Sequence, residues 1–123
     1  MKNVLAKYHN SSFELREPRV FIADNGVYYA NIYGDQMHPF YKPGDMVAIR
    51  KVDDFDYGHA HIIKTFPEQN DLKIVRYAIK HPTDDSRVIL RSANPTVYPD
   101  LDWSKSYCEY IFKIVGLIRI EEN

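Results

Sequence analysis

Short runs of apolar and β-branched residues alternate with polar turns along almost the whole chain. Runs of about four to eight such residues, bounded by Gly, Pro, Asn and Asp, are typical of β-strands, and no stretch keeps a helical period. Strands are predicted at 18–23, 27–33, 46–52, 59–66, 72–79, 86–92 and 107–120. This near-regular spacing favours an all-β (mainly β) domain, either a twisted pair of sheets or a partly open barrel.

Two segments break the regular pattern. Residues 1–17 mix apolar and polar positions, so we expect a weakly structured arm or edge strand ahead of a domain at 18–123. Residues 94–105 contain two prolines and are expected to be irregular.

Glycines indicate three local features. Asn25-Gly26 is a strong signal for a tight turn, which would join the first two predicted strands as a hairpin. Pro43-Gly44 suits a type II turn, because proline presets the first central residue and glycine takes positive φ at the second. Gly116, inside the last predicted strand, indicates a bulge or the close approach of another backbone.

Composition and charge indicate which classes of binding partner and which cellular compartment suit the chain. The formal net charge is −1, with acidic and basic residues interspersed, which argues against a domain that grips a nucleic-acid backbone by itself. Cys108 is the single cysteine, which excludes an internal disulfide and fits a reducing compartment. No segment has the character of a signal peptide or a membrane span. We therefore expect a soluble cytoplasmic domain without a membrane partner.

The most informative stretch reads Gly34-Asp35-Gln36-Met37-His38-Pro39, followed by Gly44-Asp45 and an apolar strand. It resembles the nucleophile loop of the LexA and phage-repressor family, the self-cleaving Ser-Lys peptidase fold that UmuD-type proteins share. The family pattern there is Gly-Asp-Ser-Met-x-Pro, then Gly-Asp and an apolar strand. Only the serine position differs, and it is occupied by Gln36.

The resemblance extends over roughly residues 27–120. The family carries its catalytic lysine in a Val-Lys-Arg or Val-Lys-Tyr context, and the match here is Val75-Arg76-Tyr77, which places Arg76 at the lysine position. A shifted alignment would offer Lys73, whose neighbours fit the pattern less well. Further matches are Ser92-Ala93-Asn94, Tyr98-Pro99 and the apolar segment 114–119.

These two replacements remove the chemistry that the resemblance would bring. Gln36 has no hydroxyl to deprotonate, and Arg76 stays charged because its pKa lies above about 12. No Ala-Gly or Cys-Gly bond, the kind that the family cleaves, occurs in the chain. Gln36 and Arg76 could hydrogen-bond to each other, or both could face solvent. The resemblance implies a non-catalytic relative with a vestigial cleft at Gly34, Asp35, Gln36, Met37, Pro39 and Arg76.

Other candidate sites have plainer explanations. His59 and His61 lie two apart in a predicted strand and would share one face, but no third zinc ligand is suitably spaced. We expect a surface or half-buried histidine pair. The acidic run 53–56 lacks the ligand pattern of a calcium loop and is expected to be a solvated turn. Tyrosines 28, 29, 33 and 41 are assigned to packing rather than to base stacking. No metal or cofactor is predicted.

The function implied by the resemblance is a catalytically inactive dimerisation and regulatory domain of a phage-repressor-type transcriptional regulator. DNA contact would belong to an N-terminal helix-turn-helix absent from this chain. The apolar last strand would pair with its own copy in a two-fold homodimer, with an interface at Ile114, Gly116, Leu117 and Ile118. Two alternatives remain open. One is an autoproteolytic peptidase with an unorthodox dyad, such as another serine with Lys73, and the other is a peptide or small-ligand sensor that uses the vestigial cleft.

Overall fold

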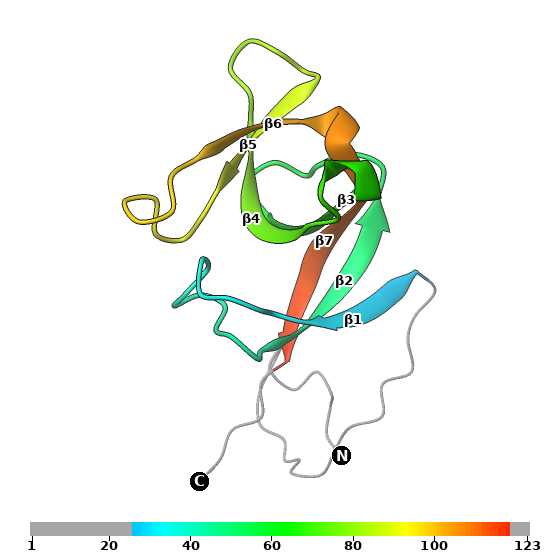
Figure 1. Cartoon of the computed structure of the whole chain (residues 1–123). Helices are drawn as coiled ribbons and strands as arrows, with labels where there is room; N and C mark the ends of the chain where they lie inside the picture. The colour runs from blue at the N-terminus through cyan, green and yellow to red at the C-terminus, as the bar shows by residue number, and fades with distance from the viewer. Residues whose placement is uncertain (1–25, 119–123) are drawn as a thin grey trace, which may run out of the picture.

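A computed structural model describes residues 26–118, which form an all-β domain (Figure 1). Its strands are β1 (Val27–Asn31), β2 (Met46–Val52), β3 (Ala60–Thr65), β4 (Lys73–Lys80), β5 (Arg87–Arg91), β6 (Leu101–Ser104) and β7 (Cys108–Ile118). Two short 3-10 turns accompany them, η2 (Pro67–Gln69) and η3 (Lys105–Tyr107). The predicted fold class is confirmed. The predicted arm at 1–17 and strand at 18–23 lie outside the described residues. Within residues 26–118, no helix is long and apolar enough to cross a membrane.

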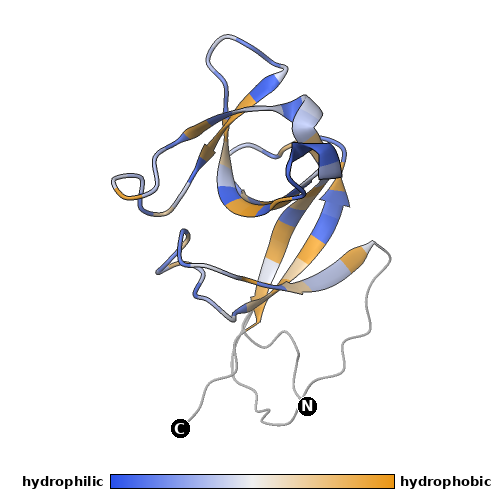
Figure 2. Cartoon of the chain, in the orientation of Figure 1, coloured by the Kyte–Doolittle hydropathy of each residue, from blue (hydrophilic) through white to orange (hydrophobic). Residues whose placement is uncertain are grey.

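The seven strands form one antiparallel sheet in the order β1-β2-β7-β3-β4-β5-β6. The sheet is not closed, because β1 and β6 form its two edges within the described chain. It is therefore a single twisted sheet rather than a pair of sheets (Figure 1). β7 lies inside the sheet, between β2 and β3, and this position accounts for its long apolar run. In Figure 2, hydrophobic residues recur along the length of β2 and β7.

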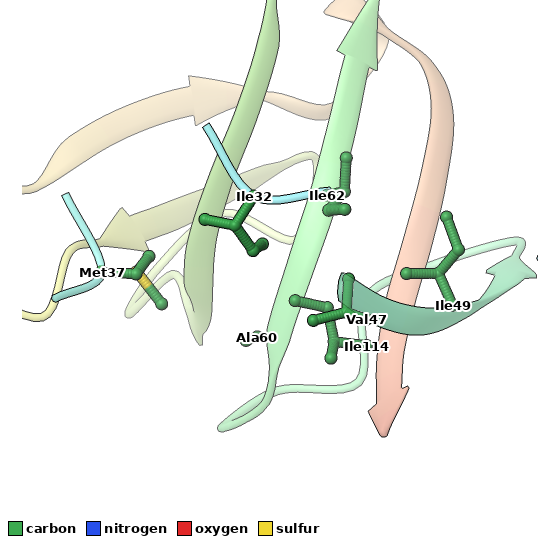
Figure 3. Packing of buried hydrophobic residues seen from close by; sticks show 7 residues of the cluster. All are labelled: Ile32, Met37, Val47, Ile49, Ala60, Ile62 and Ile114. Atoms are coloured by element: carbon green, nitrogen blue, oxygen red, sulfur yellow. The ribbon is translucent and has the colours of Figure 1, made fainter. Parts of the chain in front are cut away.

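Buried side chains pack in two clusters. The first contains Ile32, Met37, Val47, Ile49, Ala60, Ile62 and Ile114 (Figure 3). The second contains Phe55, Ile63, Ala78, Val88, Leu90 and Ile111. Ile62 and Ile63 belong to different clusters because successive residues of a strand point to opposite faces. β3 and β7 thus contribute side chains to both clusters.

A bulge in β7 confirms the feature predicted at Gly116. Ala48 pairs with Gly116 and Ile49 pairs with Ile114, so Val115 is the extra residue of the bulge. Val115 is 44% exposed, whereas Ile114 beside it is buried. The bulge lets Ala48 and Ile49, which are consecutive in β2, both remain buried.

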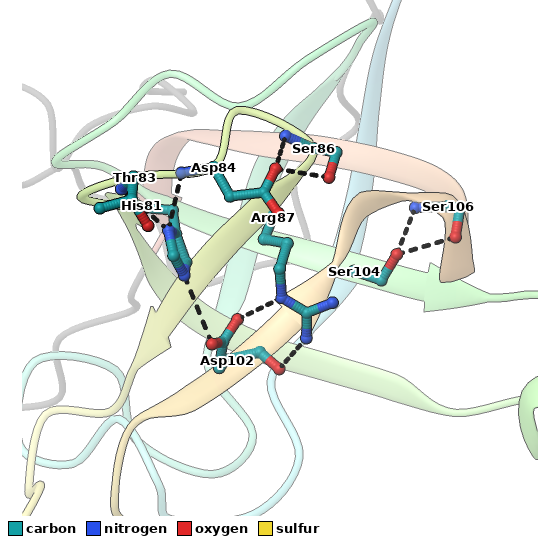
Figure 4. Close-up of polar contacts among 8 residues, drawn as sticks. All are labelled: His81, Thr83, Asp84, Ser86, Arg87, Asp102, Ser104 and Ser106. Carbon is teal, nitrogen blue, oxygen red and sulfur yellow. Dashed lines mark hydrogen bonds and ion pairs between the residues drawn. The ribbon is translucent and has the colours of Figure 1, made fainter.

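β6 corrects the prediction that residues 94–105 are irregular. This edge strand pairs only with β5 among the described strands. Arg87 of β5 donates from Nε to Asp102 Oδ1 at 2.6 Å and from Nη2 to the Asp102 carbonyl at 3.0 Å, and His81 Nε2 lies 3.3 Å from Asp102 Oδ2 (Figure 4). Apolar and polar residues alternate from Leu101 to Ser104, as in a strand. The two prolines just before this short segment led to the prediction of an irregular structure. The other predicted strands agree with the observed bounds to within two residues wherever the structure describes them.

Candidate functional site

The loop between β1 and β2 is closed at its base by backbone hydrogen bonds. Ile32 N donates to the Asp45 carbonyl and Gly44 N donates to the Ile32 carbonyl, both at 2.8 Å. Gly44 has φ +90°, as the predicted turn requires, and the Asp45 carboxylate accepts from Lys42 N at 2.8 Å. The ends of the loop therefore lie side by side, and its tip projects from the end of two strands.

Met37 anchors the tip of this loop in the first core cluster. It is only 1% exposed and belongs to the same buried cluster as Ile32 and Val47 (Figure 3). Burial of a side chain of this size stabilises the folded state by about 1.5–3 kcal/mol. The methionine of the motif is therefore a packing residue, and its burial fixes the position of the residues on either side.

A second attachment joins the loop to the segment after β5. Ala93 N donates to the Gln36 carbonyl at 2.9 Å, and the Tyr98 hydroxyl donates to Asp35 Oδ1 at 2.7 Å. The Asp35 carboxylate raises the pKa of Tyr98. Ser92 holds the same segment in shape, because its Oγ donates to the Tyr98 carbonyl at 2.9 Å and accepts from Asn94 N at 3.0 Å. The two sequence matches, around 34–39 and 92–99, thus meet in space.

A cleft of about 610 Å³ lies beside this junction. Its lining comes from β1, the start of the loop, β3, β4 and the first residue of β6. The lining residues are Tyr29, Ala30, Asn31, Tyr33, Gly34, Gln36, Ile62, Lys73, Ile74, Val75, Arg76 and Leu101. Gln36 and Arg76, the two positions matched to the dyad, share this cleft although they are far apart in sequence.

The remaining predicted cleft residues fall into two groups. Gly34 lines the cleft, whereas Asp35, Met37 and Pro39 are absent from its described lining. Asp35 is instead bound to Tyr98, Met37 lies in the core, and Pro39 is exposed. Sequence reasoning missed the wall formed by Tyr29, Ala30 and Asn31, because no motif marks those positions.

The Gln36 side chain folds back over Gly34. A Cβ atom built on Gly34 would lie 2.5 Å from Gln36 Oε1, and Gly34 has φ +79°. The backbone conformation favours glycine at this position, whereas the space occupied by the flexible Gln36 carboxamide could be vacated by a side-chain movement. The carboxamide therefore lies against the main chain of its own loop.

Arg76 is half-buried and poorly satisfied. Its Nη1 donates to the carbonyl of the preceding residue, Val75, at 2.9 Å, and its Nε is buried with no hydrogen-bond partner among the described residues. Burial lowers the pKa of the Arg76 guanidinium. No hydrogen bond joins Arg76 to Gln36 within the described residues, so the two side chains share the cleft without pairing.

The described lining contains no aliphatic hydroxyl or thiol. Within the part of the chain that the structure describes, no serine, threonine or cysteine lines the cleft, and its hydroxyl groups belong to Tyr29 and Tyr33. Lys73 lies in the same wall as Arg76 but is exposed. The arrangement can bind and orient a chain segment through polar and cationic groups. Among the described lining residues, the hydroxyls are phenolic and the basic groups are those of Lys73 and Arg76.

The histidine prediction was wrong in one respect. β3 begins at Ala60, so His59 precedes the strand and is exposed, whereas His61 is fully buried. Among residues 26–118, no group of three or more His, Cys, Asp or Glu side chains is arranged to hold a metal ion. The acidic run is not merely solvated either, because Asp56 N donates to His61 Nε2 at 3.1 Å and Phe55 is buried.

The family model described as Peptidase S24-like matches residues 3–118, which is nearly the whole chain. A comparison with curated individual proteins gives no match.

Proposed function

Because the chain belongs to the Peptidase S24-like family, we propose that it is a non-catalytic member. In this proposal it serves as the dimerisation and regulatory domain of a phage-repressor-type transcriptional regulator. The observation that carries the proposal is that Gln36 and Arg76 line one cleft at the positions matched to nucleophile and base. A carboxamide has no hydroxyl group that could lose its proton and become an alkoxide nucleophile. A guanidinium stays protonated near neutral pH, so it cannot act as the base that removes such a proton.

The composition of the cleft supports inactivity over an unorthodox dyad. Lys73 could act as a base only if a hydroxyl lay within hydrogen-bond reach. Among the described lining residues the hydroxyls are those of Tyr29 and Tyr33, and no hydrogen bond links Lys73 to a serine. The absence of an Ala-Gly or Cys-Gly bond removes the substrate as well.

Dimerisation through β7 is supported by its pairing pattern. β3 pairs with β7 only from Cys108 to Lys113, whereas β2 pairs with β7 as far as Ile118. Along Ile114–Ile118, the side of β7 that faces away from β2 has no strand partner among the described residues. A second copy related by a two-fold axis would satisfy those backbone groups at Ile114, Gly116, Leu117 and Ile118.

DNA contact is assigned in this proposal to a helix-turn-helix outside the chain. The near-zero net charge supports that assignment, because domains that bind the phosphate backbone need clustered basic residues. The domain would then regulate by holding two DNA-binding segments together in the cytoplasm.

The test follows the mass of the full chain over time at about pH 7 to 10, where a lysine base could begin to lose its proton. Each sample is incubated with and without an activated recombinase filament, and a self-cleaving relative confirms that the filament is active. We expect the intact mass throughout. The double variant Gln36→Ser with Arg76→Lys should also stay intact, because no Ala-Gly or Cys-Gly bond is present. A discrete fragment from the unaltered chain would overturn the proposal.

A further inference from the structure

The turn between β4 and β5 is closed by the imidazole of His81. Pro82 follows it and has no N–H, so the first backbone donors of the turn belong to Thr83 and Asp84. Both donate to the same acceptor, His81 Nδ1, at 3.1 Å and 3.0 Å (Figure 4). Asparagine, aspartate and serine oxygens commonly close turns by accepting from an N–H two residues ahead. Histidine differs from them because its acceptor can be protonated near neutral pH.

The other ring nitrogen fixes the tautomer of His81. Its Nε2 lies 3.3 Å from Asp102 Oδ2 on β6, and a carboxylate can only accept. The proton of the neutral ring therefore sits on Nε2, which leaves Nδ1 as the acceptor for the turn. Only 12% of the His81 side chain is exposed. The neutral ring thus satisfies three contacts at once, two within the turn and one to β6.

The charged groups that face His81 from β5, β6 and the turn keep their charge between about pH 8 and pH 5. Hydrogen bonding by Arg87 lowers the pKa of Asp102, and hydrogen bonding by Ser86 lowers the pKa of Asp84. Both carboxyls therefore stay ionised in this range. Asp102 raises the pKa of the Arg87 guanidinium, which stays protonated. His81 is the member of this network that changes charge.

The other charges beside the turn compensate one another. Lys80 Nζ, at the end of β4, donates to Asp85 Oδ1 at 2.9 Å, which raises the pKa of Lys80 and lowers that of Asp85. Lys105 of η3 donates from its backbone N to the turn, but its ammonium lies 3.0 Å from Asp54 Oδ1. These pairs keep their charges over the same pH range, so they leave the titration of His81 as the variable.

A second proton on the ring conflicts with the closed turn. An Nδ1–H would face the N–H groups of Thr83 and Asp84, and both donors would lose their acceptor. The Asp84 carboxylate lies on the same turn, but it accepts from Ser86 Oγ at 2.6 Å and must leave Ser86 to accept from Nδ1–H. The carboxylates of Asp84 and Asp102 would stabilise the imidazolium once the turn has opened.

We propose that His81 is a pH-sensitive switch: its neutral ring holds the β4–β5 turn closed, and its protonation opens the turn. Opening rearranges residues 83–86, while Asp102 keeps its contacts with the ring and with Arg87. The end of β4 then presents a differently shaped and more positive surface in mild acid. The switch goes beyond the proposed function, because none of these groups belongs to the described lining of the cleft.

The test is an NMR titration of the full chain from about pH 7.5 to pH 5. The ring 15N signals of His81 report its tautomer and protonation. Amide exchange rates of Thr83 and Asp84, each divided by the rate of an unstructured chain at the same pH, report opening of the turn. These corrected rates should rise about tenfold with the same midpoint as the ring signals, as expected for the loss of a hydrogen bond.

His81→Asn is the decisive variant. Its Oδ1 can accept the same two N–H groups but takes up no proton in this range, so the corrected rates should stay low throughout. His81→Ala has no acceptor and should exchange quickly at every pH. His59→Asn is the matched control, because His59 is exposed and lies outside this network. It should behave like the wild type.

Four outcomes would overturn the switch. Corrected rates could stay constant while the His81 ring titrates, or the ring could stay neutral down to pH 5. The rise could also persist in His81→Asn, which would assign it to another group. A rise shared by the amides of the core residues Ile63 and Leu90, which are fully buried, would mean that the whole domain unfolds.

Discussion

His61 has both ring nitrogens committed to the backbone in a buried site. Nδ1 donates to the His59 carbonyl at 2.9 Å, and Nε2 accepts from Asp56 N at 3.1 Å. The ring of Phe55 packs edge-on against the imidazole, with centroids 5.1 Å apart. A proton added at Nε2 would face the Asp56 N–H, so the geometry holds the ring in its neutral form. The pKa of His61 is lowered, first by burial.

The charged groups around His61 come from several elements. Its neighbour across the β3–β7 pair is Lys113, and its neighbour across the β3–β4 pair is Arg76. Both are cations, which oppose a positive imidazole. The Asp56 carboxylate favours the charged ring, but it is bound by Lys113 Nζ at 2.5 Å. Burial, with smaller contributions from His59 and Lys113, therefore outweighs the hydrogen bond to the His59 carbonyl and the Asp56 carboxylate, and the pKa of His61 falls.

The free energy of unfolding should fall as the pH drops from about 7 toward 5. The unfolded chain takes up a proton at the ordinary histidine pKa of about 6.5, whereas the folded chain resists it until lower pH. The stabilisation is thus present above the unfolded pKa and is lost as pH falls toward the folded one. His61→Asn should cost about 1–3 kcal/mol near pH 7.5, through lost buried contacts, and should flatten the slope in this window. Urea unfolding at several pH values measures both quantities.

His59→Asn is the matched control for this experiment, because His59 is exposed. It should keep most of the pH slope of the wild type, because burial is the largest cause of the lowered pKa of His61. An unchanged slope in His61→Asn would show that other groups cause the pH dependence.

At this scale the sequence predicted which residues meet but not how they are oriented. The motif resemblance brought Gln36 and Arg76 to one site, and they do line one cleft. The Gln36 side chain lies over Gly34, whose φ is positive, and the motif does not indicate this conformation. The prediction that His59 and His61 lie in one strand and share a face was wrong, because β3 begins between them, at Ala60.

β7 shows how one element combines core and surface roles. Ile111 and Ile114 belong to the two separate core clusters, while the bulge turns Val115 outward. The sequence predicted the strand and its irregularity at Gly116, because apolar β-branched runs and internal glycines are local signals. It could not predict the place of β7 between β2 and β3, which is set by long-range pairing. β6 was missed for a related reason: an edge strand of four residues depends on its partner, and its own pattern is weak.

Val115→Asp should convert a homodimer into a folded monomer. Val115 is 44% exposed and sits in the half of β7 that β3 leaves unpaired, so a charge there disturbs an interface more than the core. Leu117 is a poorer test position because it packs against the first core cluster. Sedimentation velocity gives the mass, and circular dichroism confirms the fold.

Val97→Asp serves as the control for dimerisation. Val97 is 59% exposed in the segment after β5, away from β7, so this variant should remain a dimer. A wild-type chain that sediments as a monomer at high micromolar concentration would contradict the dimer proposal.

Across the whole molecule, most described basic side chains of the sheet are neutralised by acids. Lys64 binds Asp71 and Glu109, and similar pairs recur over the surface. The other pairs are Lys80–Asp85, Arg87–Asp102, Arg91–Asp100, Lys105–Asp54 and Lys113–Asp56. Exposed pairs of this kind add little stability, about 0–1 kcal/mol each. Their larger effect is to break up any basic stripe that could follow a phosphate backbone.

The isolated chain should therefore bind random duplex DNA weakly. We expect a dissociation constant above about 10 µM at 0.1 M salt, because tight non-specific binding needs several unpaired lysines or arginines on phosphates. A fluorescence titration with a short random duplex at two salt concentrations checks this. Nanomolar affinity that falls steeply with salt would contradict the assignment of DNA contact to another segment.

The order of strands in the sheet has a consequence for how the chain emerges from the ribosome. β7 joins β2 to β3, yet among the seven strands that the structure describes it is the last to be translated. Until it arrives, the nascent chain holds two fragments that do not pair: the β1–β2 hairpin and the β3-to-β6 meander. The apolar faces of β2 and β3 then stay open to other chains and to holdase chaperones. Completion of the sheet waits for a contact between distant parts of the sequence, which is the kind of contact that makes folding slow.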